Sequence, residues 1–216
     1  MDKDWEDTAD RLANAAVSDG DPTRWFDELY SSGERGEHSM PWDRGAPNGL
    51  IAEWGNRREG AGARALVIGC GLGRDSEYLA TRGYTVTAID VAPTAIRTAQ
   101  ERYPDSTVHY RVANLLDAPA DLLGTFDLVV ESYTVQALPP TVRADATKAV
   151  VSMVAPGGTL LVIAMVRADG EPVAGPPWKM TRAEIDAFDL DQVLVEELAS
   201  DSGYRQWRAE FHRPAD

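Results

Sequence analysis

The chain has 216 residues, 44% of them hydrophobic, which is enough for one sizeable core. A net charge of −14 at pH 7 repels a phosphate backbone and argues against a nucleic-acid partner. One cysteine and three scattered histidines offer neither a disulfide nor a metal-binding spacing, and no apolar run approaches the roughly 20 residues of a membrane span. Because the N-terminus is acidic and unlike a signal peptide, we expect a cytoplasmic protein of one domain, residues 1–216, without metal or membrane contact.

The first 60 residues are expected to form N-terminal helices. Apolar residues at three-to-four-residue spacing predict a helix from Trp5 to about Val17, which the segment SDGD ends. Asp21 as N-cap and Pro22 at the first helical position predict a second helix, which ends near the polar loop SSGERGEHS at 31–39.

From residue 61 to residue 216 apolar runs alternate with helical patterns, which is typical of parallel strands joined by crossover helices. The last two runs read as an antiparallel hairpin. We therefore predict an α/β fold: a Rossmann-like, doubly wound, mostly parallel seven-stranded sheet with an antiparallel C-terminal hairpin. The expected strands are RALVIG (64–69), YTVTAID (84–90), VHYRVAN (108–114), FDLVVES (126–132), TLLVIAMV (159–166), QVLVEELA (192–199) and YRQWRAEFH (204–212). Four further helices are expected in this part. The first ends at Thr81, the second spans Pro93 to Arg102, the third begins at Arg143 and stops at APGG (155–158), and the fourth lies around Thr181 to Phe188.

A glycine-rich turn follows the first strand of the predicted sheet. Gly69, Gly71 and Gly73 have the spacing G-x-G-x-G, which lets a ligand approach the backbone at the carboxyl edge of the sheet. The dinucleotide fingerprint needs its third glycine at position 74, where this chain has Arg74. Asp90 ends the next strand, where a carboxylate can accept hydrogen bonds from both ribose hydroxyls. Two alternatives stay open: a tight turn without a ligand, and Asp90 as a helix cap before Pro93.

The glycine spacing is similar to the first motif of class I S-adenosylmethionine-dependent methyltransferases. That resemblance implies a methyl donor lying over the loop, Asp90 on its ribose and Val91 on its adenine. It also implies that Asn114 and Leu115, at the next strand end, read the adenine edge, although asparagine is also an ordinary turn residue. The strand FDLVVES would then face the sulfonium.

Further motifs resemble the thiopurine and halide/thiol methyltransferase group over roughly residues 24–166. They are Trp25, PWDRGAP (41–47), VIGCGLGRDS (67–76), TAID (87–90) and FDLVVESYTVQALPPTVR (126–143). In that group a tryptophan-bearing helix and the Pro-Trp-Asp loop form an N-terminal lid over the cofactor. The segment GRDSEYLATRGYTV (73–86) is also similar to bacterial tellurite-resistance methyltransferases. The chain departs from the group at Leu29, where plant members have a second cofactor-facing tryptophan, and at Asn114, which replaces an acid.

The resemblance assigns roles to individual side chains. Trp25 and Trp42 would pack around the methionine or sulfonium end of the donor, whereas Trp5 is expected to be a core residue. Arg143 would support the cofactor or the substrate. The expected cofactor-binding residues are Trp25, Trp42, Gly69, Cys70, Gly71, Gly73, Asp75, Asp90, Val91, Asn114, Leu115, Glu131 and Ser132. Cys70 is expected to serve as a small residue in the turn and not as a nucleophile.

The predicted reaction is methyl transfer from S-adenosylmethionine, which becomes S-adenosylhomocysteine, to a small-molecule acceptor. A thiol, with a pKa of about 8.5, needs little help from a base, so a sulfur nucleophile is favoured. A phenol or an amine would gain more from a base. The candidate catalytic residues are Glu131, Tyr133, Arg143 and Asp43, with His38 as a further candidate base.

Several alternatives stay open. The acceptor could be a nitrogen or oxygen of a secondary metabolite. A different class of protein, an NAD(P)-dependent oxidoreductase, is disfavoured by Arg74 and by the lack of a Tyr-x-x-x-Lys pair. A non-catalytic ligand-binding module is a third hypothesis, and both a monomer and a homodimer are compatible with the sequence.

Overall fold

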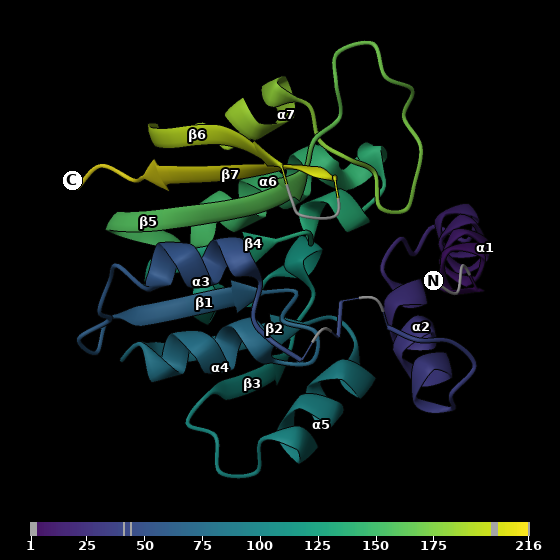
Figure 1. Cartoon of the computed structure of the whole chain (residues 1–216), viewed down its shortest axis with the longest axis horizontal. Coiled ribbons are helices and arrows are strands. Elements are labelled where there is room, and N and C mark those ends of the chain that lie inside the picture. Colours follow the sequence, from purple (N-terminus) through teal and green to yellow (C-terminus); the bar gives the residue numbers. More distant parts are fainter. Residues whose placement is uncertain (1–3, 41, 44, 200–202, 216) are drawn as a thin grey trace.

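The structure is a computed structural model, and it describes residues 4–40, 42–43, 45–199 and 203–215. Its centre is a seven-stranded sheet with the order β3-β2-β1-β4-β5-β7-β6 (Figure 1). Strands β1 to β5 run parallel, and β7 is antiparallel to both β5 and β6. The predicted Rossmann-like sheet with a C-terminal antiparallel hairpin is confirmed.

The elements follow one another as strands and crossover helices after an N-terminal helical segment. The strands are β1 (Arg64–Ile68), β2 (Thr85–Asp90), β3 (His109–Val112), β4 (Phe126–Ser132), β5 (Val154–Met165), β6 (Asp191–Ala199) and β7 (Arg205–His212). The helices are α1 (Asp4–Ser18), α2 (Arg24–Glu34), α3 (Gly49–Gly55), α4 (Arg74–Thr81), α5 (Pro93–Arg102), α6 (Pro140–Met153) and α7 (Arg182–Asp186), with short 3-10 turns at Leu115–Asp117, Ala120–Leu122 and Val135–Ala137.

Two apolar layers cover the two faces of the sheet because successive strand residues point to opposite sides. In β1, Ala65 and Val67 pack with α3, α4 and α5, whereas Leu66 and Ile68 pack with α6 and α7. Helices α1 and α2 instead lie beside the carboxyl ends of the parallel strands, as Figure 1 shows at the right of the view. This position leaves them over the edge where the glycine turn was predicted.

Three local expectations need correction. Helix α2 begins at Arg24 and not at Pro22; the Asp21 carboxylate accepts hydrogen bonds from the Thr23 and Arg24 amides and so caps a turn before the helix. The segment APGG does not separate α6 from the next strand. It belongs to β5, where pairing jumps from Phe126↔Val154 to Leu128↔Thr159, so these residues form a bulge.

The third correction concerns α3, which the sequence reading did not predict. The residues that define this helix are few. The Asn48 side chain caps it by accepting a hydrogen bond from the Leu50 amide, and Ile51 and Trp54 form its buried face. Seven residues are too few for a clear helical period.

No helix within the described residues is long and apolar enough to cross a membrane. The same residues contain no group of three or more His, Cys, Asp or Glu side chains that could hold a metal ion.

Candidate functional site

The glycine turn forms a tight passage from β1 to α4. Gly69, Gly71 and Gly73 have φ values of 61°, 51° and 87°, in the left-handed region that favours glycine. A Cβ atom on Gly71 would lie 2.8 Å from the Tyr30 hydroxyl oxygen and 4.0 Å from Cδ1 of Trp42. The turn therefore needs glycine both for its backbone path and for the close approach of side chains from the N-terminal helices and loop.

The Asp90 carboxylate ties the ends of β1 and β2 together. It accepts hydrogen bonds from the Gly71 amide and the Ala92 amide, each at 2.9 Å. The side chain is only 6% exposed, and its burial raises the pKa of this carboxyl to about 6, although the hydrogen bonds from Ala92 and Gly71 oppose that rise. A carboxylate has about four lone-pair positions, so it can accept further hydrogen bonds from a ligand.

Tyr30, on α2, lies at this crevice and was not predicted from the sequence. It is 8% exposed, packs against Leu72, Ala92 and Ala95, and its burial together with the charge of Asp90 raises its pKa well above the usual value. Its neighbour in α2, Leu29, points instead into the core between α1 and α2. An aromatic residue next to Leu29 was the only sequence signal for this role.

Trp42 lies beside Tyr30 over the glycine turn. Its ring makes edge-on contacts with Tyr30 and with Trp5, both at 5.9 Å between ring centroids, and it is 39% exposed. Trp5 thus contacts the loop tryptophan in addition to its place near the α1–α2 core. Pro41, the first residue of the Pro-Trp-Asp motif, and Arg44 lie outside the described residues.

Trp25 occupies the core of the N-terminal helices. It is 3% exposed, packs with Ala9, Ala13 and Leu29, and stacks on Phe26 at 4.1 Å between centroids. Its indole nitrogen has no hydrogen-bond partner among the described residues. Trp25 therefore packs α1 against α2, while Trp42 and Tyr30 lie at the glycine turn.

Asp43 and Asp75 are both held by other parts of the chain. Asp43 forms a two-bond ion pair with Arg102, and its hydrogen bonds to that guanidinium lower the pKa of Asp43 despite partial burial. Asp75 accepts a hydrogen bond from the Asn48 amide at 2.7 Å, and burial raises its pKa. Asp43 is thus a weak proton acceptor, whereas Asp75 fixes the start of α3 to the start of α4.

The adenine-side candidates lie at the ends of β2 and β3. Leu115 is buried in the core, and Val91 is half-buried beside Asp90. The Asn114 side chain accepts a hydrogen bond from the Leu116 amide at 2.9 Å and so caps the 3-10 turn that follows. Asn114 therefore forms a turn, as the alternative prediction had it. Its side-chain amide nitrogen is the group that could contact a ligand.

Glu131 is a buried carboxyl at the end of β4. It is 0% exposed; its Oε1 accepts hydrogen bonds from the Thr134 and Val135 amides at 2.7 and 2.8 Å, and its Oε2 has no hydrogen-bond partner among the described residues. Burial raises the pKa of Glu131 to about 7, against the opposing effects of these amides and of Arg143. A carboxyl in this state can exchange a proton near neutral pH.

The residues around Glu131 point in different directions. Ser132 accepts a hydrogen bond from the Asn48 side chain at 3.3 Å. Tyr133 has a φ of 60°, which breaks the strand alternation, and its hydroxyl accepts a hydrogen bond from Gln206 on β7. The end of β4 therefore places Glu131 in the interior beside Ile68, the last residue of β1 before the glycine turn, and turns Tyr133 toward β7.

Arg143, on α6, is 5% exposed and is used within the protein. It forms an ion pair with Glu184 and donates a hydrogen bond to the Trp178 carbonyl at 2.7 Å. Glu184 also completes the capping box of α7 with Thr181. Arg143 thus joins α6 to the loop before α7.

Cys70 is buried, and burial raises the pKa of its thiol well above the usual value. A thiol in this state is a poor nucleophile. His38 donates to or accepts from Ser32 at 2.8 Å, close to the end of α2.

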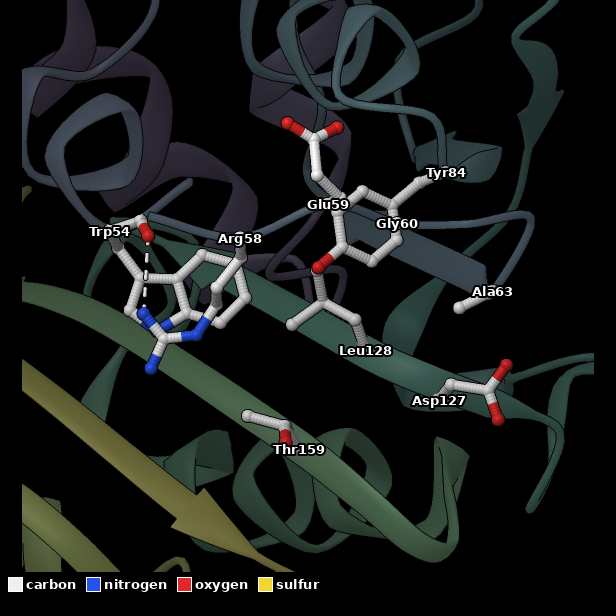
Figure 2. Close-up of a pocket in the computed structure, with 9 residues that line it drawn as sticks. All are labelled: Trp54, Arg58, Glu59, Gly60, Ala63, Tyr84, Asp127, Leu128 and Thr159. Atoms are coloured by element: carbon white, nitrogen blue, oxygen red, sulfur yellow. Dashed lines mark hydrogen bonds between the residues drawn. The ribbon is translucent and has the colours of Figure 1, made fainter. Parts of the chain in front are cut away.

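A separate pocket of about 160 Å³ lies at the opposite edge of the sheet (Figure 2). Its lining residues include Ala63, Tyr84 and Asp127, at the amino ends of β1, β2 and β4. Arg58 lies over the Trp54 ring, and both donate hydrogen bonds to Glu210. In open parallel sheets ligands bind at the carboxyl ends of the strands, so this pocket is not the candidate site.

The fold and the crevice together define a class I methyltransferase architecture: a doubly wound sheet with an antiparallel β7, a glycine turn after β1 and an acid at the end of β2. The chain belongs to the thiopurine S-methyltransferase family, whose model matches residues 34–212.

Two similar proteins are methyltransferases by name, and a third shares the fold. The ubiquinone biosynthesis O-methyltransferase of Xanthomonas axonopodis pv. citri is 39% identical over 114 residues. The match covers 51% of this chain and 46% of that protein, so the chain spans about half the length of the curated relatives it matches. Among solved structures, the N-methyltransferase NodS from Bradyrhizobium japonicum, in complex with S-adenosyl-L-homocysteine, is 26% identical, with a TM-score of 0.66 over 86% of this chain and 98% of that chain. A structure from work on thioacetal formation during echinomycin biosynthesis is 22% identical, with a TM-score of 0.70 over 87% and 91%, and shares the fold.

Proposed function

We propose that this protein binds S-adenosylmethionine in the crevice between the glycine turn and Asp90 and transfers its methyl group to a small-molecule acceptor. The observation that carries the proposal is the Asp90–Gly71 hydrogen bond of 2.9 Å, which joins an acid at the end of β2 to the glycine turn after β1. The pairing lies at the carboxyl ends of β1 and β2, and β1 borders the switch point between β1 and β4, where cofactors bind in open α/β folds. Membership of a methyltransferase family supports it and stands against an NAD(P)-dependent oxidoreductase.

The residues at the crevice suit this cofactor. Asp90 retains lone pairs for two ribose hydroxyls, and Gly69, Gly71 and Gly73 leave the backbone accessible at the turn. When bound, the cofactor supplies a methyl group on a cationic sulfonium. The rings of Tyr30 and Trp42 lie over the turn, where aromatic faces can stabilise such a cation and exclude water.

For the acceptor we propose a sulfur nucleophile, with a nitrogen or oxygen of a small metabolite as the alternative. A thiol near neutral pH needs little general-base help, and the described residues near the crevice provide one buried carboxyl, Glu131, with an unpartnered oxygen and a pKa of about 7. The family description names a sulfur acceptor, whereas the Xanthomonas relative is an O-methyltransferase and NodS is an N-methyltransferase. Ser132 would line the donor end beside Glu131.

The test is methyl transfer from a labelled donor to matched aromatic thiols, phenols and amines. We expect the highest kcat/KM with a thiol, and a strongly raised KM for the donor in the variant Asp90→Ala. Glu131→Gln should lower activity on a phenol or an amine more than on a thiol, because only the former acceptors need a base. Equal losses on all acceptors would contradict a base role for Glu131, and no transfer to any acceptor would contradict catalysis.

A further inference from the structure

Asp43 forms the centre of a three-residue ion cluster at the edge of the crevice. Its two carboxylate oxygens accept hydrogen bonds from the Arg102 guanidinium at 2.8 and 2.9 Å, and its Oδ1 also lies 3.4 Å from Arg74. The three side chains are only 27 to 30% exposed. A two-bond arginine–carboxylate pair fixes orientation as well as distance.

The two arginines come from parts of the fold that flank the cofactor crevice. Arg102 is the last residue of α5, the helix that follows Asp90, and Arg74 is the first residue of α4, directly after Gly73. Arg74 stands where a dinucleotide-binding turn would have glycine. The cluster therefore connects the loop that carries Asp43 to the ends of both crevice helices.

The residue before Asp43 is Trp42, the ring that lies over the glycine turn. Trp42 contacts Tyr30 at 5.9 Å between centroids, and both side chains approach Gly71. The Trp42 ring contacts Trp5 and Tyr30, but 39% of the residue is exposed, so packing alone constrains it weakly. An anchor at the next residue limits where this ring can lie.

We propose that Asp43 is a positioning residue: its ion pairs with Arg102 and Arg74 hold Trp42 against Tyr30, so that the aromatic wall of the donor site is formed before the donor binds. This inference rests on the proposed function. It gives Asp43 a role other than proton transfer and gives Arg74 a role in the donor site. An ordered wall lowers the conformational cost of donor binding.

The direct test is calorimetric titration of S-adenosylhomocysteine into Asp43→Asn, Arg102→Gln and the double variant. We expect each single variant to raise the dissociation constant about 5-fold and the double variant to add little, because both remove the same pair. The matched control is Glu59→Gln, which breaks the ion pair between Glu59 and Arg82 at the opposite edge of the sheet and should leave the affinity unchanged. An unchanged affinity in Asp43→Asn would overturn the proposal.

Kinetics separate positioning from proton transfer. Loss of positioning raises KM for the donor and leaves kcat at saturating donor unchanged, whereas loss of a base lowers kcat with an unchanged KM. The second pattern in Asp43→Asn would also overturn the proposal.

If the wild-type protein does not bind S-adenosylhomocysteine, the proposed function fails, and the positioning role is decided by the accessibility of Trp42. Acrylamide quenching of tryptophan fluorescence measures this accessibility. The contribution of Trp42 is the difference between each protein and the same protein with Trp42→Phe. Greater quenching of Trp42 in Asp43→Asn, at an unchanged melting temperature, supports the positioning role, and equal quenching contradicts it.

Discussion

The Asp90 carboxylate accepts a hydrogen bond from the Gly71 amide at 2.9 Å, and this contact joins the ends of β1 and β2 at the crevice. If Asp90 also binds the donor ribose, Asp90→Ala removes two charge-assisted hydrogen bonds and should weaken S-adenosylhomocysteine binding by roughly 2 kcal/mol or more. The control is Asp127→Ala. Asp127 accepts a hydrogen bond from the Arg64 amide at 2.8 Å, but at the opposite edge of the sheet. Equal effects of the two substitutions would refute the ribose assignment.

Donor binding should depend on pH through Asp90. Because burial raises its pKa to about 6, the carboxylate that binds hydroxyl groups best is fully formed only above about pH 7. We expect the donor affinity to be constant from pH 7 to 8 and to fall below pH 6, approaching tenfold per pH unit. Titration calorimetry from pH 5 to 8 measures this curve. A flat curve would show that the ionisation of Asp90 does not contribute to binding.

Glu131 should make the protein less stable as the pH rises. Its pKa is raised from 4.5 to about 7 in the folded protein, so between these values the folded state binds more protons than the unfolded state. The free energy of unfolding therefore contains a favourable contribution below pH 4.5, which is lost as the pH rises through 7. The loss should be roughly 3 kcal/mol by pH 8.

Glu131→Gln tests this linkage without disturbing the turn. A single oxygen of Glu131 accepts both the Thr134 and Val135 amides, and the glutamine oxygen can take the same two hydrogen bonds. Denaturant unfolding at pH 5 and pH 8 should show a smaller pH effect in the variant than in the wild type. An identical pH effect in both proteins would mean that Glu131 does not titrate in this range.

The glycine turn predicts a steric coupling between Gly71 and Tyr30. Gly71→Ala places a Cβ atom 2.8 Å from the Tyr30 hydroxyl oxygen, at a φ of 51° that costs a non-glycine residue roughly 1 to 2 kcal/mol. The variant should lose both stability and donor affinity. Adding Tyr30→Phe removes the contacting oxygen and should restore part of the stability, measured by denaturant unfolding. Strictly additive losses would indicate that the two residues do not touch.

The proximity of the glycine turn and Asp90 can be predicted from the sequence because its signals are local. The glycine spacing requires a particular backbone path, and Asp90 ends an apolar run that the alternating pattern predicts as the next parallel strand, so the predicted topology brings them together. Neither relation depends on side-chain packing far along the chain.

Other features depend on tertiary contacts that spacing does not encode. Tyr30 reaches the crevice because Asp27 of α2 accepts a hydrogen bond from the Thr94 amide of α5, 67 residues along the chain, and so docks the helix there. Arg143 contacts Glu184 and the Trp178 carbonyl, which lie 41 and 35 residues further along the chain. The sequence pattern around Tyr30 or Arg143 does not distinguish contacts with other parts of the protein from contacts with a bound ligand.

The central claim is that the crevice binds the nucleoside thioether of a methyl donor. Parallel calorimetric titrations of the wild-type protein with S-adenosylhomocysteine and with NADH, at pH 7.5, test it most directly. The structure predicts saturable binding of S-adenosylhomocysteine that is strongly weakened by Asp90→Ala, and no binding of NADH. Tight NADH binding without S-adenosylhomocysteine binding would contradict the account.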